Sequence, residues 1–141
     1  MLALACAPLA LLVADAITDG LGANPVEAVL HRTGDWALRL LLATLAVAPL
    51  RRWTGWQWLL QIRRPLGLLA FGYAVLHALT YLVLDRGLYW DDVVADVLER
   101  PYVTAGFTAL ILMVPLAVTS TRAAMRRLGR RWQSLHRLVY A

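Results

Sequence analysis

The arrangement of apolar stretches constrains this chain more than any other feature of its sequence. Four of them occupy residues 2–17, 36–50, 66–84 and 102–118, and a fifth begins at Leu135. A helix of about 20 largely apolar residues can cross a bilayer, because its backbone N–H and C=O groups bond to one another where no water is available. We therefore predict an all-α fold, a polytopic transmembrane helical bundle with four spans and the start of a fifth.

The first stretch is short for a span and contains Asp15. A cleavable signal peptide ending near Ala14-Asp15-Ala16 is the alternative, although no basic segment precedes the apolar run as it does in signal peptides. No basic residues flank the first stretch at Met1. The fifth stretch begins at Leu135 and has only about two helical turns up to Ala141. We therefore expect residues 1–141 to be one transmembrane domain that is truncated at its C-terminus and possibly at its N-terminus.

The charged residues between the stretches predict the orientation of the bundle. All 14 basic residues are arginines, and ten of them lie in two segments without acidic residues, at 51–64 and 122–137. Short basic loops remain in the cytoplasm. The loops at 19–35 and 85–100 hold eight of the nine acidic residues and are expected on the other side. This alternation places the N-terminus in the cytoplasm.

Composition supports a membrane protein rather than a soluble or nucleic-acid-binding one. Hydrophobic residues make up 60% of the chain and charged residues 16%, a balance that is too apolar for an average soluble domain. The net charge of +5 comes from the cytoplasmic arginines, so we interpret it as a topology signal and a contact with anionic membrane lipid, with no nucleic acid involved. The six tryptophans lie at the predicted membrane boundaries, as an aromatic belt requires: Trp36 and Trp90 outside, and Trp53, Trp56, Trp58 and Trp132 inside.

Motifs for hydrolysis or nucleotide binding are absent. The sequence has no Gly-x-Ser-x-Gly, no phosphate-binding loop and no His-Glu-x-x-His, and its one cysteine, Cys6, can form neither an internal disulfide nor a metal site by itself. The acidic residues Asp91, Asp92, Asp96 and Glu99 are expected to form a solvated loop face rather than a paired catalytic site. No catalytic residue is predicted in this chain.

His77 is the most informative residue, because it lies within the third apolar stretch. Ionisable side chains at membrane depth are rare and usually functional. The neutral imidazole suits an axial haem ligand whose second ring N–H is held by a hydroxyl or a backbone carbonyl. Small residues near the same helical face, Gly67, Ala70 and Ala74, would let a bulky planar group approach, although close helix packing explains them equally well. The alternative for His77 itself is a structural hydrogen bond to a neighbouring helix.

Two further histidines are weaker candidates. His136 lies at the cytoplasmic edge of the fifth stretch, a position suited to an inner cofactor or to a hydrogen bond with a quinone or flavin. His31 belongs to the outer loop beside Arg32, where helix capping or contact with a partner is as plausible as ligation. The candidate cofactor-binding residues are thus His77, His136 and His31, of which His77 and His136 are the candidate metal ligands.

Several short strings, taken in order along the chain, carry a family resemblance. They are LGANPVE at 21–27, HRTG at 31–34, RRPLGL at 63–68, HALTY at 77–81, RPY at 100–102, TST at 119–121 and LGRRWQSLHRLVY at 128–140. Each is weak alone, but the ordered set resembles the MsrQ (YedZ) family within the ferric-reductase-like transmembrane superfamily. The last string is the most specific.

This resemblance implies a haem b electron-transfer subunit of the bacterial inner (plasma) membrane, with FMN as an additional possible cofactor. Electrons would pass from the quinone pool to MsrP, a periplasmic molybdopterin methionine sulfoxide reductase subunit with which the chain would form a heterodimer that repairs oxidised proteins. By its position in the motifs, His77 looks like the third-span haem ligand and His136 like the fifth-span histidine. His31 matches a family histidine without an assigned role.

The chain departs from the family pattern after His136. The family continues for two more spans and has a further histidine about thirteen residues on, which a helix would raise by about 20 Å, near the depth of His77. Two-haem relatives also carry a histidine one such interval before the third-span ligand, where this sequence has Arg63 and Arg64. We therefore predict no second bis-histidine haem of that kind.

Two alternatives from other functional classes remain at this point. The chain could be a non-redox membrane assembly or scaffold subunit in which His77 only contacts a neighbouring helix. It could also be a ferric or quinone reductase with a different electron acceptor. Haem content separates the first alternative from the electron carrier, and the identity of the acceptor separates the second.

Overall fold

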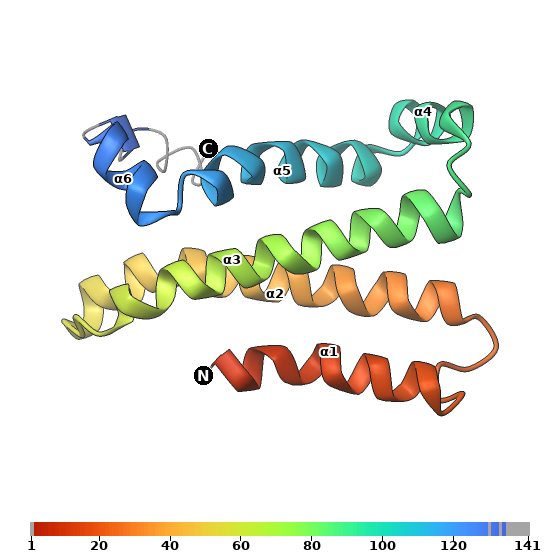
Figure 1. Cartoon of the computed structure of the whole chain (residues 1–141), viewed down its shortest axis with the longest axis horizontal. Coiled ribbons are helices and arrows are strands. Elements are labelled where there is room, and N and C mark those ends of the chain that lie inside the picture. The colour runs from red at the N-terminus through yellow and green to blue at the C-terminus, as the bar shows by residue number, and fades with distance from the viewer. Residues whose placement is uncertain (1, 130, 133, 135–141) are drawn as a thin grey trace.

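The structure is a computed structural model that describes residues 2–129, 131, 132 and 134. These residues form helices and turns without strands, so the predicted all-α fold is confirmed. The elements in chain order are α1 (Leu2–Ile17), α2 (Pro25–Thr54), α3 (Leu59–Leu79), the π-helical turn η1 (Thr80–Asp85), α4 (Trp90–Glu99), α5 (Pro101–Val118) and α6 (Arg122–Leu128). Figure 1 shows α1, α2, α3 and α5 side by side with their axes nearly aligned.

Three helical segments among the described residues are long and apolar enough to cross a membrane: Pro25–Thr54, Leu59–Asp85 and Pro101–Val118. They correspond to the second, third and fourth predicted spans. The first predicted span is the helix α1, whose 16 residues extend about 24 Å, less than the hydrocarbon thickness of about 30 Å. The fifth predicted span lies outside the described residues.

The second span begins about eleven residues earlier than the apolar pattern predicts. Asn24 caps the helix by accepting a hydrogen bond from the backbone N–H of Glu27, and its side-chain amide donates to the Glu27 carboxylate. Pro25 occupies the first turn, where its missing N–H costs nothing. The segment predicted as an outer loop around His31 is therefore helical, and the prediction that His31 lies in a loop is wrong.

The third span also begins earlier than predicted, at Leu59, so Pro65 lies inside α3 rather than at its start. Pro101 does occupy the first turn of α5, as predicted. At the outer end of α3 the helix continues as the wider π-helical turn η1, which includes Tyr81. Single π-helical turns inside longer helices often occur at functional sites.

Helices α2 and α3 form the central pair of the bundle. Their core contains Leu40, Ala70 and Tyr73, and Ala70 is completely buried. A Cβ atom on Gly67 would lie 3.5 Å from the Thr44 methyl group, so the small residues of α3 permit a close approach of the two helices. For Gly67 and Ala70 the structure thus favours the helix-packing interpretation over contact with a planar ligand.

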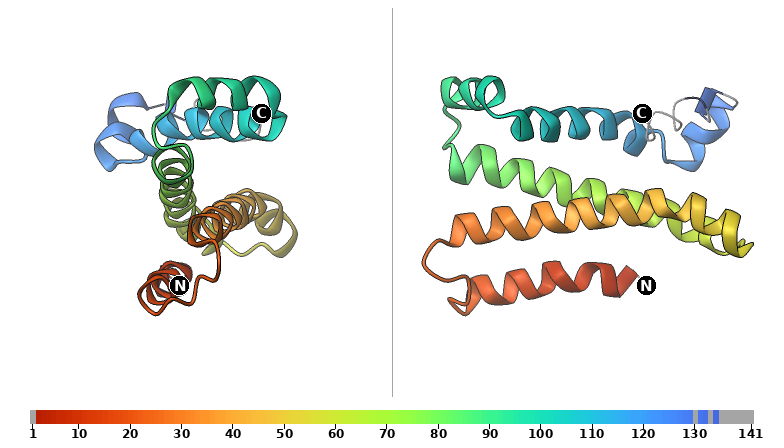
Figure 2. Two further views of the ribbon diagram at one scale, coloured as in Figure 1. Left: turned by 90° about the vertical axis from the view of Figure 1, so that its right-hand side faces the viewer. Right: turned by 180° about the vertical axis from the view of Figure 1, so that it is seen from behind.

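The two ends of the bundle differ in charge, as predicted. In Figure 1 the α2–α3 connection and α6 lie at one end, whereas the α1–α2 connection and α4 lie at the other. Among the described residues, the first end carries the arginines at 51–64 and Arg126, Arg127 and Arg131, and the second carries the acidic residues of the α4 region. Figure 2 shows α4 lying across the direction of the spans, so its axis is parallel to the plane of a membrane that the spans would cross.

Large apolar side chains remain exposed along the spans. Examples are Leu38, which is 57% exposed on α2, and Ile111, which is 67% exposed on α5. A soluble protein would bury such side chains, but the hydrocarbon of a bilayer solvates them. This surface agrees with a polytopic membrane protein.

Candidate functional site

His77 lies near the outer end of α3, and its imidazole is held by α2. Its Nδ1 lies 2.9 Å from the backbone carbonyl oxygen of Leu30 and 3.5 Å from the Thr33 hydroxyl. A carbonyl oxygen only accepts hydrogen bonds, so Nδ1 carries the proton and donates it to Leu30. In this tautomer Nε2 has a lone pair available for a metal ion. The Leu30 carbonyl is one of the two kinds of partner, a hydroxyl or a backbone carbonyl, that we predicted for the second ring N–H of a haem-ligating histidine.

Thr33 and Gly34 make this contact possible. Thr33 is completely buried, and its hydroxyl donates to the Val29 carbonyl oxygen at 2.7 Å. A Cβ atom on Gly34 would lie 3.0 Å from Cε1 and 3.1 Å from Nδ1 of His77. These distances are shorter than ordinary van der Waals contacts, so the imidazole rests directly on the backbone of α2. Residue 34 must be very small for His77 to occupy this position.

His77 lines a cavity of about 470 Å³ between α2, α3 and α5. This volume falls within the range of about 300–1,000 Å³ that is typical of small-molecule and cofactor sites. Much of the wall is apolar and comes from all three helices: Ala37, Leu38 and Leu41 on α2, Ala74 and Ala78 on α3, and Val103, Phe107, Leu110 and Met113 on α5. The imidazole thus faces a space in which a sizeable apolar ligand fits.

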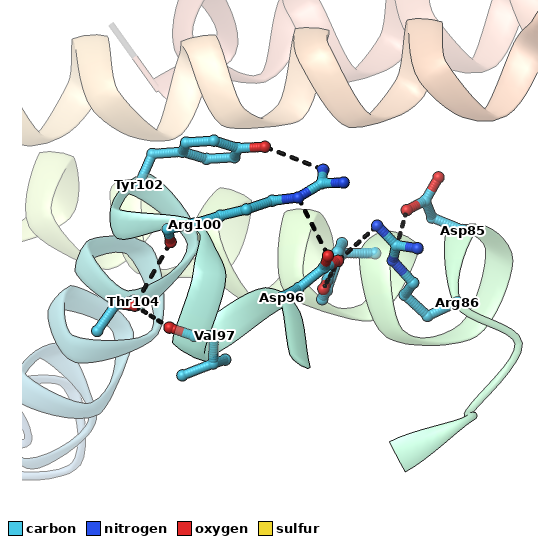
Figure 3. Close-up of polar contacts among 8 residues, drawn as sticks. Asp85, Arg86, Asp96, Val97, Arg100, Tyr102 and Thr104 are labelled. Carbon is cyan, nitrogen blue, oxygen red and sulfur yellow. Dashed lines mark hydrogen bonds and ion pairs between the residues drawn. The ribbon is translucent and has the colours of Figure 1, made fainter. Parts of the chain in front are cut away.

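A cluster of charged residues surrounds Asp96 at the outer end of this cavity. The Tyr81 hydroxyl donates to Asp96 Oδ2 at 2.7 Å, Arg86 Nη2 lies 2.5 Å from Oδ2, and Arg100 Nε lies 3.1 Å from Oδ1. Figure 3 shows the two guanidinium groups reaching Asp96 from different directions, with the Tyr102 hydroxyl beside Arg100. Asp96 is only 7% exposed. The cluster connects η1, α4 and the start of α5.

This cluster corrects the expectation that Asp96 belongs to a solvated loop face. Residues 90–99 form the helix α4, and its inward face carries Val93 and Asp96. The sequence does contain a signal for this arrangement. Asp96 and Arg100 have the i, i+4 spacing of an ion pair on a helix, and Val93, three residues before Asp96, would lie on the same helical face. The pairing of Asp96 with Arg86 and Tyr81 could not be inferred, since it depends on the fold of the η1–α4 connection.

The electrostatics of the cluster predict a pH dependence of stability. The hydrogen bond from Tyr81, together with the positive charges of Arg100 and Arg86, holds the pKa of Asp96 below its ordinary value. Because the pKa is lower in the folded than in the unfolded protein, the stabilisation is complete above about pH 4 and is lost as the pH falls through the folded value. Ordinary working conditions therefore leave the cluster intact.

We expect the melting temperature of Asp96→Asn in detergent to lie a few degrees below that of the wild-type protein at pH 7. The difference in melting temperature should stay constant down to about pH 4 and become smaller below it, because only the wild-type protein has a carboxylate at position 96 that can be protonated. Scanning fluorimetry from pH 3 to 7 measures this difference, in which the contributions of the other acidic residues cancel. A gap of the same size at pH 3 would show that the charge of Asp96 is not the source of the stabilisation.

The structure places the other two candidate histidines differently. His31 lines the rim of the cavity, but its side chain is 75% exposed and its Nε2 lies 3.7 Å from the Glu27 carboxylate. His136 lies outside the described residues. Among the described residues, no three His, Cys, Asp or Glu side chains come together as a metal site. A metal at His77 would therefore need a second ligand from elsewhere or arrive within a prosthetic group.

Residues 33–141 match the family described as the ferric reductase like transmembrane component. Three similar curated proteins are each named "Protein-methionine-sulfoxide reductase heme-binding subunit MsrQ". The protein from Ralstonia nicotianae is 56% identical over 97% of this chain and 64% of its own length. The Azospira oryzae protein is 57% identical over 88% of this chain and 54% of its own length. The Herminiimonas arsenicoxydans protein is 52% identical over 88% of this chain and 57% of its own length.

No solved structure matches the chain. The chain spans between 54% and 64% of the length of these relatives. The match to the family covers most of the chain, including α3, α5 and His77. Together with the exposed apolar helices, this match shows that the protein is a polytopic membrane protein that belongs to the ferric reductase like transmembrane component family.

Proposed function

We propose that this chain is part of a haem b electron-transfer subunit of the bacterial inner membrane. In this proposal it passes electrons from the quinone pool to MsrP, a periplasmic methionine sulfoxide reductase subunit, so that oxidised proteins are repaired. The observation that carries the proposal is the geometry of His77, whose Nδ1 bonds the Leu30 carbonyl while the ring lines a cavity of about 470 Å³. The names of the similar proteins supply the class of partner.

The residues around the cavity fit an iron porphyrin. The described wall is largely apolar, which suits the body of a macrocycle, and the imidazole is held in the tautomer that ligates through Nε2. When bound, an iron porphyrin supplies reversible one-electron chemistry, which the protein side chains themselves lack. His77 would hold the iron, and Leu30 and Thr33 would fix the orientation of the imidazole.

The position of the cavity agrees with a role in charge transfer across a membrane. His77 lies eight residues, or about 12 Å, from the end of the helical segment at Asp85, and thus in the outer half of the bundle. An electron crossing about 30 Å of hydrocarbon from the cytoplasmic side needs a further redox group on the inner side. We propose that His136 serves such an inner site, with a quinone or FMN as the group that it contacts.

A ferric reductase with a different acceptor is the second candidate, and the description of the matched family favours it. The reduced full-length protein separates the two when it is mixed either with a methionine sulfoxide reductase partner or with a ferric chelate. We expect the haem, followed by its Soret band, to be reoxidised at least about tenfold faster by the reductase than by the ferric chelate, because docking of the protein acceptor brings the redox groups together. Equal or faster reoxidation by the ferric chelate would reverse the assignment, and a colourless protein would support the scaffold alternative.

A further inference from the structure

The cavity beside His77 has two chemically different ends. Apolar side chains, such as those of Leu41, Leu110 and Met113, line it toward the inner side of the bundle. The outer end carries Arg86 and Arg100 together with their acidic and tyrosine partners. A ligand that fills this space would be amphipathic, with an apolar body and a negatively charged edge.

Asp96 fixes both guanidinium groups at the outer end. It accepts from Arg86 through Oδ2 at 2.5 Å and from Arg100 through Oδ1 at 3.1 Å. The Arg100 side chain also donates from Nη1 to the Tyr102 hydroxyl at 3.1 Å, and Figure 3 shows its guanidinium between these two partners. The side chains are held from more than one direction, so their charges are positioned before any ligand binds.

The two arginines retain hydrogen-bonding capacity beyond these contacts. A guanidinium has five N–H donors. Arg86 Nε is buried without a hydrogen-bond partner in the described part of the chain, although Asp85 lies 3.4 Å away as an ion pair. The two arginines share the one buried carboxylate of Asp96, so this triad carries a net charge of +1. Asp85 and Asp35 also line the cavity, but their side chains are 37% and 65% exposed, so solvent screens their charges more than that of Asp96. Asp35 is also paired with Arg39.

We propose that Arg86 and Arg100 bind the carboxylates of the cavity ligand, with Asp96 as the residue that positions them. On the proposed function, on which this inference rests, these carboxylates are the propionate groups of an iron porphyrin. The porphyrin body then contacts the apolar wall, and the propionates face the outer side of the bundle. Planar guanidinium groups suit this task because they bind carboxylates through two parallel hydrogen bonds.

Binding of iron protoporphyrin and of its dimethyl ester tests the proposal, because the ester keeps the iron and the macrocycle but has no propionate charge. We expect the full-length apoprotein in detergent to bind the free acid at least about tenfold more tightly, as judged from Soret titration. Arg86→Gln and Arg100→Gln should each reduce this preference about tenfold or remove it, while leaving the affinity for the ester nearly unchanged.

Two matched variants separate ligand contact from a purely structural role. Arg32→Gln removes an arginine that pairs with Asp15, and neither of these residues lines the cavity, so this variant should keep the full preference for the free acid. Arg100→Lys keeps the charge but loses the planar geometry, and an intermediate preference is expected. If the arginines only hold α4 in place, their variants would weaken binding of both porphyrins equally. That result would overturn the proposal.

The same titration distinguishes this inference from the proposed function. Equal affinity of the wild-type protein for the acid and the ester would refute the arginine site and leave haem binding at His77 untouched. Metal-free protoporphyrin and its dimethyl ester, followed by fluorescence in the His77→Ala variant, test the arginines without any iron ligand. A preference for the free acid there supports the arginine site even if His77 proves not to ligate iron.

Discussion

Replacing His77 with alanine is expected to abolish haem retention by the full-length protein purified in detergent. The haem content per polypeptide should fall at least about tenfold, since even loss of a partner that only orients a ligand costs about 10–100-fold in affinity. The physical reason is that His77 is the one imidazole in the described residues that lines the cavity at membrane depth in a fixed orientation. The pyridine haemochrome assay and the Soret band measure the loss.

His31→Ala is the matched control for this experiment. His31 lines the rim of the same cavity, but its side chain is 75% exposed and pairs with Glu27 on its own helix. An exposed imidazole loses its binding energy to competing water, so we expect His31→Ala to retain the haem content of the wild-type protein. Equal haem content in the wild-type protein and the His77 variant would contradict the assignment of His77.

The general architecture could be predicted from the sequence because the bilayer imposes a simple rule. Runs of apolar residues and the distribution of arginines depend on helix length and on membrane charge, and neither requires knowledge of tertiary contacts. The helices at Pro25–Thr54, Leu59–Asp85 and Pro101–Val118 agree with three of the predicted spans. His77 could be selected by the same logic, because a histidine inside such a run is costly without a role.

The helix boundaries and the polar cluster could not be predicted in the same way. Hydropathy ends a span at its last apolar residue, whereas α2 extends outward to the Asn24 cap through a stretch that also contains charged residues such as Glu27 and Arg32. The cap itself was readable, since Asn-Pro followed by Glu27 is a helix-start pattern. The burial of Asp96 depends on which residues the η1–α4 connection brings together, and no local pattern specifies that.

Enlarging Gly34 is expected to produce the second large effect, because this residue lines the cavity and lies directly against the His77 imidazole. A Cβ atom there would lie 3.0 Å from Cε1 and 3.1 Å from Nδ1 of His77, and Nδ1 is the atom that donates the hydrogen bond to Leu30. The ring must therefore rotate away or lose its bond to Leu30, each of which costs about 0.5–1.5 kcal/mol. We expect haem affinity to fall by up to about tenfold in Gly34→Ala, where one of these changes relieves the contact. The larger Gly34→Val side chain requires both changes, and their summed cost of up to about 3 kcal/mol corresponds to a loss of up to about a hundredfold.

Gly72→Ala is the control that separates this contact from a general effect of glycine in a helix. Gly72 also lies on a spanning helix, α3, but a Cβ atom there would have no heavy atom within 4 Å, so its variant should keep the haem affinity of the wild-type protein. Replacing glycine with alanine in an open helical position generally stabilises the helix by about 0.4–1 kcal/mol. A loss of haem shared by all three glycine variants would point to helix distortion. A loss confined to Gly34, with a Soret shift in whatever haem remains, would show that the backbone of α2 sets the position of the His77 imidazole and with it the ligation of the iron.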